Sequence, residues 1–474
     1  MSTTPCERPE HGEIHTVEDI EEISRIIDSY SAQLWQINQK IHQNPELGYQ
    51  EKLAHDNITL MLEDLGFKVT RHAFGLDTSF VAEYGEGGRV VAFNAEYDAL
   101  PEIGHACGHN LIAMMSIGAF LGVARALEQK KIPGRVRLIG TPAEEGLGGK
   151  IPIIEAGAYT DVDACMMVHP GPFTECPGFT GDAYMPTLAS LKISVRFIGK
   201  TAHAAMAPWE GVNALDAAVL SYNSIGVLRQ QIHPCNRVHC IISDGGLRPN
   251  IIPGSSALDC YIRSPNLAMA EELFVRVKNC FDGAALQAGC TLEIIRLCHP
   301  LSPASKSALT DMGSRHNAYA DLRPNKAMAT AYAQAMSQMG KVVRCDLNSS
   351  GVPGSTDQGQ SYPLSLNAKM PTSANSQTML VGNVTYECPG IQAYVGLPAE
   401  PGANNHTPGF TAVAGTKESH DLSIHASKGM AIAGLSILKR DELAEKVRLD
   451  FEEDKKRRCL PSTTRTFDRN AGFC

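Results

Sequence analysis

Three side chains that bind metals or act as nucleophiles lie within five positions of one stretch, "GHACGHNLIAMM", at residues 104–115. They are His105, Cys107 and His109. A structural zinc site, a catalytic thiol and a two-metal hydrolase site all use residues of these types. This stretch alone does not distinguish these three kinds of site, so the other polar clusters of the chain must be considered.

Four further polar clusters each follow or end a predicted apolar strand. Asp98 follows "RVVAFNA", the adjacent Glu144 and Glu145 follow "GRVRLIG", His169 ends "VDACMMVHPG", and His406 follows "IQAYVGL". In open α/β sheets, ligands bind at the carboxyl ends of the strands. Cysteine, histidine and carboxylate side chains gathered at one sheet edge are typical of a metal site.

Each of these residues, taken alone, has a simpler interpretation. A single cysteine is most often a small buried side chain, His169 before Pro170 is as readily a strand-end residue, and two adjacent glutamates are commonly solvated. However, "TPAEEGLGG" is otherwise small and apolar, and like charges side by side there require a nearby cation. A metal would compensate one carboxylate and leave the other to act as a base. The sequence contains no His-Glu-x-x-His motif, no nucleophile elbow and no complete phosphate-binding loop.

The order of the predicted elements indicates an α/β protein with a smaller inserted domain. Helical spacing of apolar residues covers residues 17–40, and strands alternate with helices from residue 89 to 171. This alternation predicts a catalytic domain with a mixed, largely parallel sheet flanked by helices. Residues 187–301 instead follow the order βαββαβ, the ferredoxin-like pattern, which predicts an inserted lid or dimerisation domain.

These patterns divide the chain into five segments. We expect an N-terminal tail at 1–19, the catalytic domain in two parts at 20–186 and 302–447, the lid or dimerisation domain at 187–301, and a C-terminal tail at 448–474. A length of 474 residues agrees with two domains, because one core rarely serves so long a chain. The last helix is expected at about residues 420–447.

The composition is that of an ordinary globular protein, with 43% hydrophobic and 20% charged residues. A formal net charge of −9 does not favour nucleic acid, so we expect no nucleic-acid partner. The apolar run "LIAMMSIGAFLGVARAL" contains Arg125 and small residues, which indicates a buried helix and no membrane partner. The polar, acidic N-terminus lacks the apolar core of a signal peptide, so a cytoplasmic protein with mostly reduced cysteines is expected.

Several longer motifs together resemble a known family. They are "EYDALPEIGHACGHN", "GTPAEEGLGGK", "VHPG", "GKTAHAAMAPWEGVNALDA", "GGLRPNIIPG", "GSTDQG" and "NNHTPGF". These residues resemble the co-catalytic metallopeptidases of the aminoacylase and glutamate-carboxypeptidase type, the family numbered twenty among the metallopeptidases. Within that family they are most similar to the amidohydrolase branch and its cytosolic dipeptidase type. The resemblance covers about residues 20–447 and implies two divalent metal ions, usually zinc and sometimes manganese or cobalt.

The resemblance also implies roles for residues at the sheet edge. By motif, the metal ligands would be Cys107, His109, Glu145, His169 and His406. Glu144 would be the general base that deprotonates a water whose pKa the metals lower. Asp98 and His105 would support the metal-bound histidines from outside the ligand set.

Three residues of the inserted domain have implied roles as well. His203 in "GKTAHA" would donate a hydrogen bond to the oxyanion, often across a dimer interface. Asn250 in "PNIIP" and Arg263 in "CYIRS" would bind the substrate carboxylate, for which arginine offers a bidentate contact. We therefore expect a homodimer formed through the inserted domain, which would also close over a small-molecule substrate.

The expected activity is hydrolysis of the amide bond of a dipeptide or an N-acyl amino acid. Two alternatives remain at this point: an amidohydrolase for an amide conjugate in a specialised pathway, and a catalytically inactive relative that binds metal or peptide. One departure from the family pattern bears on this choice. The polar residues 360–382 intervene where the family runs from "GSTDQG" almost directly into "NVTYECPGI", so they form either a surface loop or a stretch of translated intron.

Overall fold

The computed structural model describes residues 14–145, 147–172, 179–296, 319–349 and 384–458. The predicted insertion at 360–382, and the "GSTDQG" motif before it, lie outside these described residues. The chain divides into two compact units. Among the described residues, unit 1 takes those up to 186, 322–349 and 384–458, and unit 2 takes 187–296 and 319–321.

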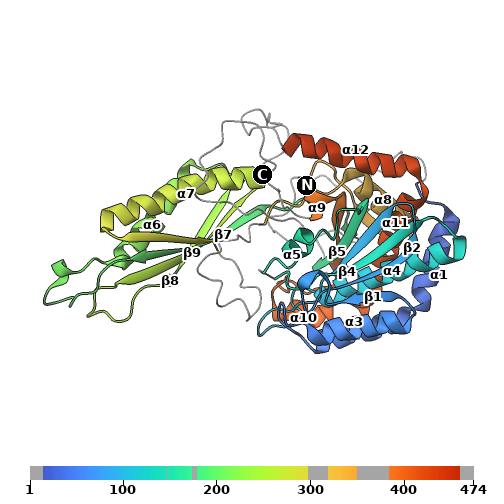
Figure 1. Cartoon of the computed structure of the whole chain (residues 1–474), viewed down its shortest axis with the longest axis horizontal. Helices are drawn as coiled ribbons and strands as arrows, with labels where there is room; N and C mark the ends of the chain where they lie inside the picture. The colour runs from blue at the N-terminus through green and yellow to red at the C-terminus, as the bar shows by residue number, and fades with distance from the viewer. Residues whose placement is uncertain (1–13, 146, 173–178, 297–318, 350–383, 459–474) are drawn as a thin grey trace. The chain divides into compact units, whose positions relative to one another are not determined.

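Unit 1 is built on an eight-stranded sheet in the order β1-β2-β4-β3-β5-β12-β6-β11 (Figure 1). Its strands are β1 (Lys68–Arg71), β2 (Phe80–Glu86), β3 (Val90–Ala95), β4 (Gly134–Gly140), β5 (Ala164–Pro172), β6 (Phe179–Asp182), β11 (Val342–Arg344) and β12 (Gly390–Leu397). The four central strands β4, β3, β5 and β12 run parallel to one another, whereas β2 pairs with β4, and β6 with β12, in antiparallel fashion. The predicted fold class, a mixed sheet flanked by helices, is confirmed.

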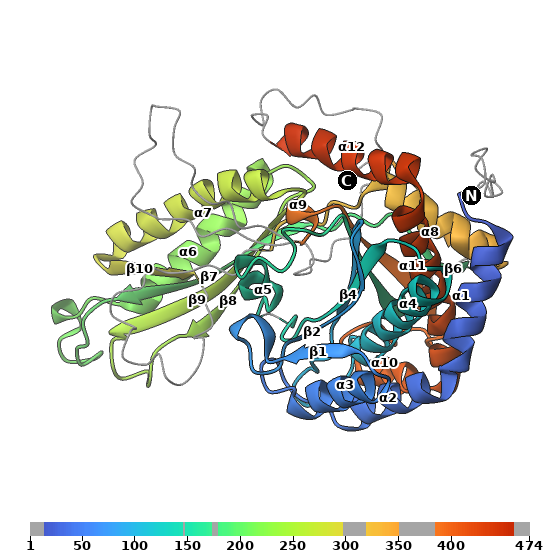
Figure 2. The same ribbon diagram turned by 45° about the vertical axis from the view of Figure 1, so that its right-hand side comes forward.

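The helices of unit 1 come from both ends of the chain. They are α1 (Val17–Ser29), α2 (Ser31–Gln43), α3 (Lys52–Asp64), α4 (His109–Lys130), α5 (Lys150–Glu155), α8 (Lys326–Gln338), α9 (Val384–Glu387), α10 (Pro408–Ala414), α11 (Lys417–Lys439) and α12 (Asp441–Arg458). Helices α4 and α11 lie side by side against the central strands, and α1 packs on both (Figure 2). Helix α4 is long and apolar enough to cross a membrane, but 94% of its most apolar window is buried inside the protein.

Two helix boundaries differ from the sequence-based expectation. The helical spacing over 17–40 predicted one helix, but the chain turns at Tyr30 between α1 and α2. The Tyr30 hydroxyl accepts a hydrogen bond of 3.0 Å from Arg125 Nε on α4, and this turn lets both short helices pack against α4. At the other end, the predicted helix at 420–447 is two helices, and the second continues to Arg458, past the point where a tail was expected.

Unit 2 has the predicted βαββαβ order. Its elements are β7 (Ala189–Ile198), α6 (Ala214–Leu228), β8 (Arg237–Asp244), β9 (Ser255–Ser264), α7 (Leu267–Ala288) and β10 (Thr291–Arg296), and the strands form an antiparallel sheet in the order β10-β7-β9-β8. Helices α6 and α7 run along one face of this sheet (Figure 2). Strand β9 alternates strictly between buried and partly exposed residues, which is the pattern of a sheet covered on one face only.

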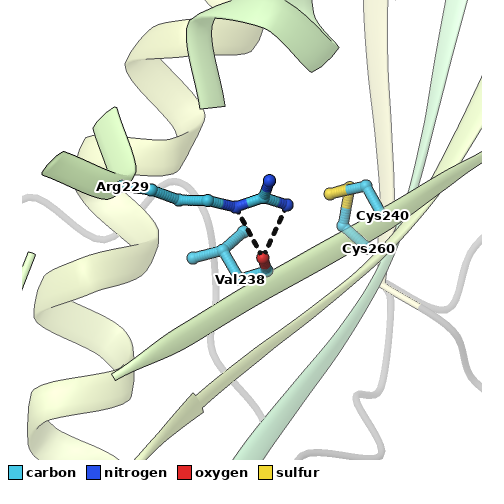
Figure 3. Close-up of a disulfide and its surroundings, with 4 residues drawn as sticks. All are labelled: Arg229, Val238, Cys240 and Cys260. Carbon is cyan, nitrogen blue, oxygen red and sulfur yellow. Dashed lines mark hydrogen bonds between the residues drawn. A yellow bond between two sulfur atoms is a disulfide. The ribbon is translucent and has the colours of Figure 1, made fainter. Parts of the chain in front are cut away.

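A disulfide joins two strands of unit 2. Cys240 on β8 lies directly opposite Cys260 on β9, and their sulfur atoms are bonded (Figure 3). Beside it, the Arg229 guanidinium donates two hydrogen bonds, of 3.1 and 2.9 Å, to the Val238 carbonyl (Figure 3). The scattered cysteines of the sequence gave no sign of this pair. The other seven cysteines among the described residues take part in no disulfide.

Candidate metal centre

The candidate site lies where the central parallel strands of unit 1 end. Asp98 follows β3, the pair Glu144 and Glu145 follows β4, His169 lies near the end of β5, and His406 follows β12. Because these four strands are parallel neighbours, their carboxyl ends form one edge of the sheet. The structure therefore brings together side chains that are more than 300 residues apart in sequence.

A left-handed glycine places Cys107 and His109 at this edge. Gly108, between them, has φ of 82° and is the residue before α4, so that His109 is the first residue of the helix. A Cβ atom on Gly108 would lie only 2.6 Å from Pro170 Cγ. Glycine meets both demands, because it tolerates positive φ and leaves room for close approach. The turn consequently packs directly onto the end of β5, beside His169.

Asp98 orients both a histidine and the glutamate turn. Asp98 Oδ1 lies 2.9 Å from His109 Nδ1, and Asp98 Oδ2 accepts a hydrogen bond of 2.8 Å from the Glu145 backbone N–H. The carboxylate thus holds Nδ1 of His109 and leaves Nε2 pointing into the site. The resemblance implied that Asp98 supports a metal-bound histidine, and this role stays a prediction.

The other two histidines are held by the backbone. His169 Nδ1 donates a hydrogen bond of 2.8 Å to the Pro170 carbonyl, which leaves His169 Nε2 at 3.4 Å from Cys107 Sγ. His406 has a left-handed φ of 66°, and its backbone N–H donates to the Ala106 carbonyl. Its Nε2 lies 3.3 Å from Glu145 Oε1. Positive φ costs about 1 kcal/mol or more for a residue with a side chain, and such strain is concentrated at functional sites.

His105 lies apart from this arrangement. Its ring stacks on His42, with 6.2 Å between the ring centroids, and no described hydrogen bond connects it to His109 or His169. The support predicted for His105 is instead given to the two histidines by Asp98 and by the Pro170 carbonyl.

The donor atoms fall into three overlapping groups, each compact enough to surround one ion. Cys107, His109 and His169 form one group; Cys107, Glu145 and His406 form a second; His109, Glu144 and Glu145 form a third. Within each group the donor atoms lie within 4.8 Å of one another. Cys107, His109 and Glu145 each belong to two groups, so the three groups form one continuous cluster of donor atoms.

The state of the buried atoms fits divalent metals. His109 Nε2 and Glu96 Oε2 are fully buried, and neither has a hydrogen-bond partner among the described residues. These two atoms are 3.5 Å apart. Buried polar atoms without partners are rare unless a ligand or ion completes them. Imidazole, thiolate and carboxylate donors are also the set that zinc prefers.

The site combines a buried thiol and a buried carboxylate with histidines that interact with them. Burial alone would raise the pKa of the Cys107 thiol, but His169 and His109 outweigh it and hold that pKa well below its usual range. Burial, followed by the negative charge of Cys107, raises the pKa of Glu145. Hydrogen bonds to Cys107 and Glu145 raise the pKa of His406 to about 10. Protons on the imidazoles thus balance the anions, and metal binding would replace those protons.

Sequence reasoning missed two buried residues beside these ligands. Lys150 begins α5 and is fully buried, with its Nζ 2.5 Å from Glu96 Oε1. The other oxygen of Glu96 faces His109. A signal for Glu96 was available, because it lies two residues before Asp98 and an extended chain places alternate residues on the same side. For Lys150 the sequence offered only "EGLGGK", an incomplete phosphate-loop pattern.

The three predicted residues of unit 2 do not lie together. His203 pairs with Ile251 in an isolated bridge, and the Ala204 N–H donates to the Asn250 carbonyl, so His203 and Asn250 are neighbours. They adjoin the end of the sheet where β9 begins at Ser255. Arg263 lies near the opposite end of β9, where its Nε donates a hydrogen bond of 3.2 Å to His239.

Comparison with known proteins assigns the family. The sequence profile of peptidase family M20/M25/M40 matches residues 92–375. The chain belongs to peptidase family M20/M25/M40. The family predicted from the motifs is therefore confirmed, as is the class of enzyme, a metal-dependent hydrolase of the dipeptidase and amidohydrolase type.

Two curated relatives of this M20 chain are similar over much of its length. The Xaa-Arg dipeptidase of Mus musculus is 37% identical over 440 residues, which cover 90% of this chain and 90% of the relative. The Xaa-Arg dipeptidase of Homo sapiens is 37% identical over 444 residues, again with 90% of each chain covered.

A solved structure shares the fold. A dinuclear metal binding peptidase of the M20 family from Bacillus subtilis superposes with a TM-score of 0.57 at 19% identity, covering 87% of this chain and 99% of that one.

Proposed function

We propose that this M20 enzyme uses two divalent metal ions to hydrolyse the amide bond of a dipeptide or N-acyl amino acid. One observation carries the proposal: donor atoms from four side chains gather around the Cys107 thiol, with the Glu144 carboxylate beside them. Cys107, His109 and His169 would hold one ion, and Cys107, Glu145 and His406 would hold the other. Zinc suits this set of donors, and manganese or cobalt could replace it.

Glu144 is the general base in this proposal. Divalent metals, when bound, lower the pKa of water toward 7 and polarise the amide carbonyl. Glu144 lies in the third group of donor atoms with His109 and Glu145, and so at the place where an attacking water would lose its proton. It accepts that proton and then donates it to the leaving amine, which restores the carboxylate.

His203 is suited to stabilise the oxyanion that develops on the carbonyl oxygen. Its Nδ1 accepts hydrogen bonds from the backbone N–H groups of Ala205 and Met206, at 3.2 and 3.1 Å. A neutral imidazole that accepts at Nδ1 carries its proton at Nε2. The exposed ring therefore presents an N–H donor, which is the requirement of an oxyanion partner.

The geometry of unit 2 supports a dimeric enzyme. His203 and Asn250 adjoin Ser255, and Arg263 lies eight residues further along the same strand. At about 3.3 Å per residue, the two ends of β9 are roughly 26 Å apart. A dipeptide spans about 7 Å, and it cannot touch both ends of one unit. We therefore assign His203 and Asn250 of one copy, and Arg263 of the other, to the same substrate.

Unit 2 also presents a surface suited to a second copy. Strand β8 is an outer strand of its sheet, and its Ile241 side chain is 63% exposed. Helix α6 beside it exposes Val219, Tyr222 and Val227, which recur at helical spacing. Pairing of two β8 strands and two α6 helices would cover an edge and an apolar stripe that are otherwise open to water. Unit 2 would thus act as both lid and dimerisation domain.

The activity can be tested with a panel of dipeptides and N-acyl amino acids on zinc-, manganese- and cobalt-loaded protein. Dipeptides with a C-terminal arginine belong first in the panel, because the mouse relative is an Xaa-Arg dipeptidase. Loss of the general base should reduce kcat by about 100-fold or more in Glu144→Gln. Glu155→Gln, an exposed glutamate of α5, is the matched control and should keep full activity. Activity that survives chelation, or an active Glu144→Gln, would refute the proposal.

The dimer can be tested by mixing two inactive variants. A His203→Ala chain keeps its own Glu144, and a Glu144→Gln chain keeps its own His203. After subunit exchange, half of the dimers are mixed and each contains one intact site, so the mixture should regain about a quarter of wild-type activity. If both variants are dimeric and exchange subunits but activity stays at the level of the variants alone, His203 does not act across the dimer.

A further inference from the structure

A buried glutamate from the N-terminal region contacts the turn that carries the general base. Glu51 precedes α3 and is fully buried. Its Oε1 accepts a hydrogen bond of 2.8 Å from the backbone N–H of Ala143, the residue before Glu144. Its Oε2 lies 2.8 Å from the Thr78 hydroxyl oxygen. Glu51 belongs to none of the three groups of donor atoms, and so its contacts with the site go through the backbone.

Helix capping does not account for Glu51. A carboxylate at the start of a helix commonly accepts hydrogen bonds from the first backbone N–H groups. At α3 this role is taken by Glu46, whose two oxygens accept from the N–H groups of Leu53 and Ala54, each at 3.0 Å. The Glu51 side chain makes no such bond to its own helix. It is directed instead toward Ala143, which is 92 residues away in sequence.

The turn that Glu51 contacts is strained. Ala143 has φ of 60°, a left-handed conformation that is unfavourable for a residue with a Cβ. The segment before α3 also packs on this residue, since a Cβ on Gly48 would lie 3.1 Å from Ala143 Cα. Two residues on, the Glu145 N–H is held by Asp98. Two buried carboxyl groups therefore hold the backbone on either side of Glu144.

We propose that Glu51 is a positioning residue of the metal centre: by accepting the Ala143 N–H, it holds the left-handed turn that directs Glu144 and Glu145 toward the ions. This inference rests on the proposed two-metal function. Burial, and then the nearby Asp98 carboxylate, raise the pKa of Glu51 to about 8, so that at neutral pH the group is mostly protonated. Glutamine is then its closest mimic, because its amide oxygen keeps the acceptor for the Ala143 N–H.

Cobalt titration of the metal-depleted full chain tests the inference without relying on turnover. Binding is measured by the charge-transfer absorption band that appears when the Cys107 thiolate coordinates Co²⁺. Glu51→Ala should weaken binding of at least one cobalt ion by about 10–100-fold, the usual effect of removing a support outside the ligand set. Glu51→Gln should bind cobalt like the wild type. Glu46→Ala is the matched control, because it removes a carboxylate of the same segment that does not contact Ala143.

A rescue variant separates positioning from general destabilisation. If Glu51 acts by holding positive φ at Ala143, then Ala143→Gly should recover roughly tenfold in cobalt affinity in the Glu51→Ala background and change little in the wild type. If Glu51→Ala does not fold, Glu51→Met, which keeps the volume and removes the acceptor, takes its place. Unchanged affinity in Glu51→Ala, an equal loss in Glu46→Ala, or no recovery with Ala143→Gly would overturn the role.

The two proposals fail in different ways. If the wild type binds two cobalt ions but hydrolyses no dipeptide or N-acyl amino acid, the proposed function fails and the cobalt titration still decides the role of Glu51. If the wild type is active and Glu51→Ala matches it in cobalt affinity and kcat, only the role of Glu51 fails.

Discussion

Replacing Lys150 with methionine should destabilise unit 1 by roughly 3–4 kcal/mol at pH 7 in the absence of metal. Lys150 and Glu96 are both buried, and their charged atoms are 2.5 Å apart. At an effective dielectric constant of 20, unit charges at this distance attract by roughly 6–7 kcal/mol. Part of that attraction is offset by the desolvation of both groups, and removal of one partner from a buried pair typically costs about 3–5 kcal/mol.

A second neighbour of Glu96 limits the size of the effect. The other carboxylate oxygen of Glu96 lies 3.5 Å from His109 Nε2, so Glu96 keeps one polar contact when the lysine ammonium is removed. The loss of stability should therefore lie toward the lower end of the range for buried pairs.

The two tryptophans make the assay specific to one unit. Trp35 lies on α2 in unit 1, and Trp209, which is 78% exposed, lies in unit 2. In a Trp209→Phe background, urea unfolding followed by fluorescence reports on unit 1 alone. The series consists of the background protein, Lys150→Met, Glu96→Gln and the double variant, all measured with a chelator present.

The double variant decides the interpretation. Without either charge, the protein should recover to within about 1 kcal/mol of the background, because a buried ion pair gives little net stability over neutral groups of similar shape. The coupling between the two sites should then be at least about 2 kcal/mol. A Lys150→Met protein as stable as the background, or a double variant as unstable as the single one, would refute the reasoning.

Three further predictions follow from the same contacts. Gly108→Ala should weaken zinc binding by at least about tenfold, because a Cβ there would lie 2.6 Å from Pro170 and the left-handed φ costs about 1–2 kcal/mol. Competition with a chromogenic chelator measures the zinc affinity, and an affinity equal to that of the wild type would contradict this prediction. The folded-state pKa of Glu51, about 8, lies above its ordinary value of 4.5, so the stability it contributes is fully present below pH 4.5 and is lost as the pH rises toward 8. Metal-depleted wild type should therefore lose more stability between pH 5 and pH 8 than Glu51→Gln, and equal slopes in urea unfolding would count against this. Reduction of Cys240–Cys260, or Cys240→Ser, should destabilise unit 2 by about 3 kcal/mol, since the bond closes a loop of 20 residues. Urea unfolding followed by circular dichroism reports this, and an unchanged midpoint would exclude it.

The sequence predicted which side chains gather at the edge of the sheet, because these residues lie in short motifs at strand ends. Cys107 and His109 flank a single glycine, and Glu144, His169 and His406 each lie close to a recognisable apolar strand. Parallel strands bring such positions to one edge whatever the loops between them do. The order of elements in residues 187–301 likewise predicted the antiparallel sheet of unit 2, because that order has one common arrangement.

The supporting residues could not be predicted in the same way. Glu51 contacts Ala143 across 92 residues of sequence, and nothing local to "ELGYQE" indicates a partner after β4. The burial of Lys150 could not be predicted, because lysines are rarely buried unless they are paired. Its partner Glu96 follows a different strand, so no local pattern connects the two residues. The turn at Tyr30 was missed because the apolar spacing continues through it and only packing on α4 interrupts the helix.

The zinc content of wild type and two variants tests the central claim most directly. If Cys107 serves two ions, the wild type should retain about two zinc ions per chain after dialysis, measured by mass spectrometry of the metal. His406→Ala should retain about one, because it removes a ligand from one group only, and Cys107→Ala should retain almost none. A wild type without zinc, or a Cys107→Ala protein that keeps two ions, would contradict the account.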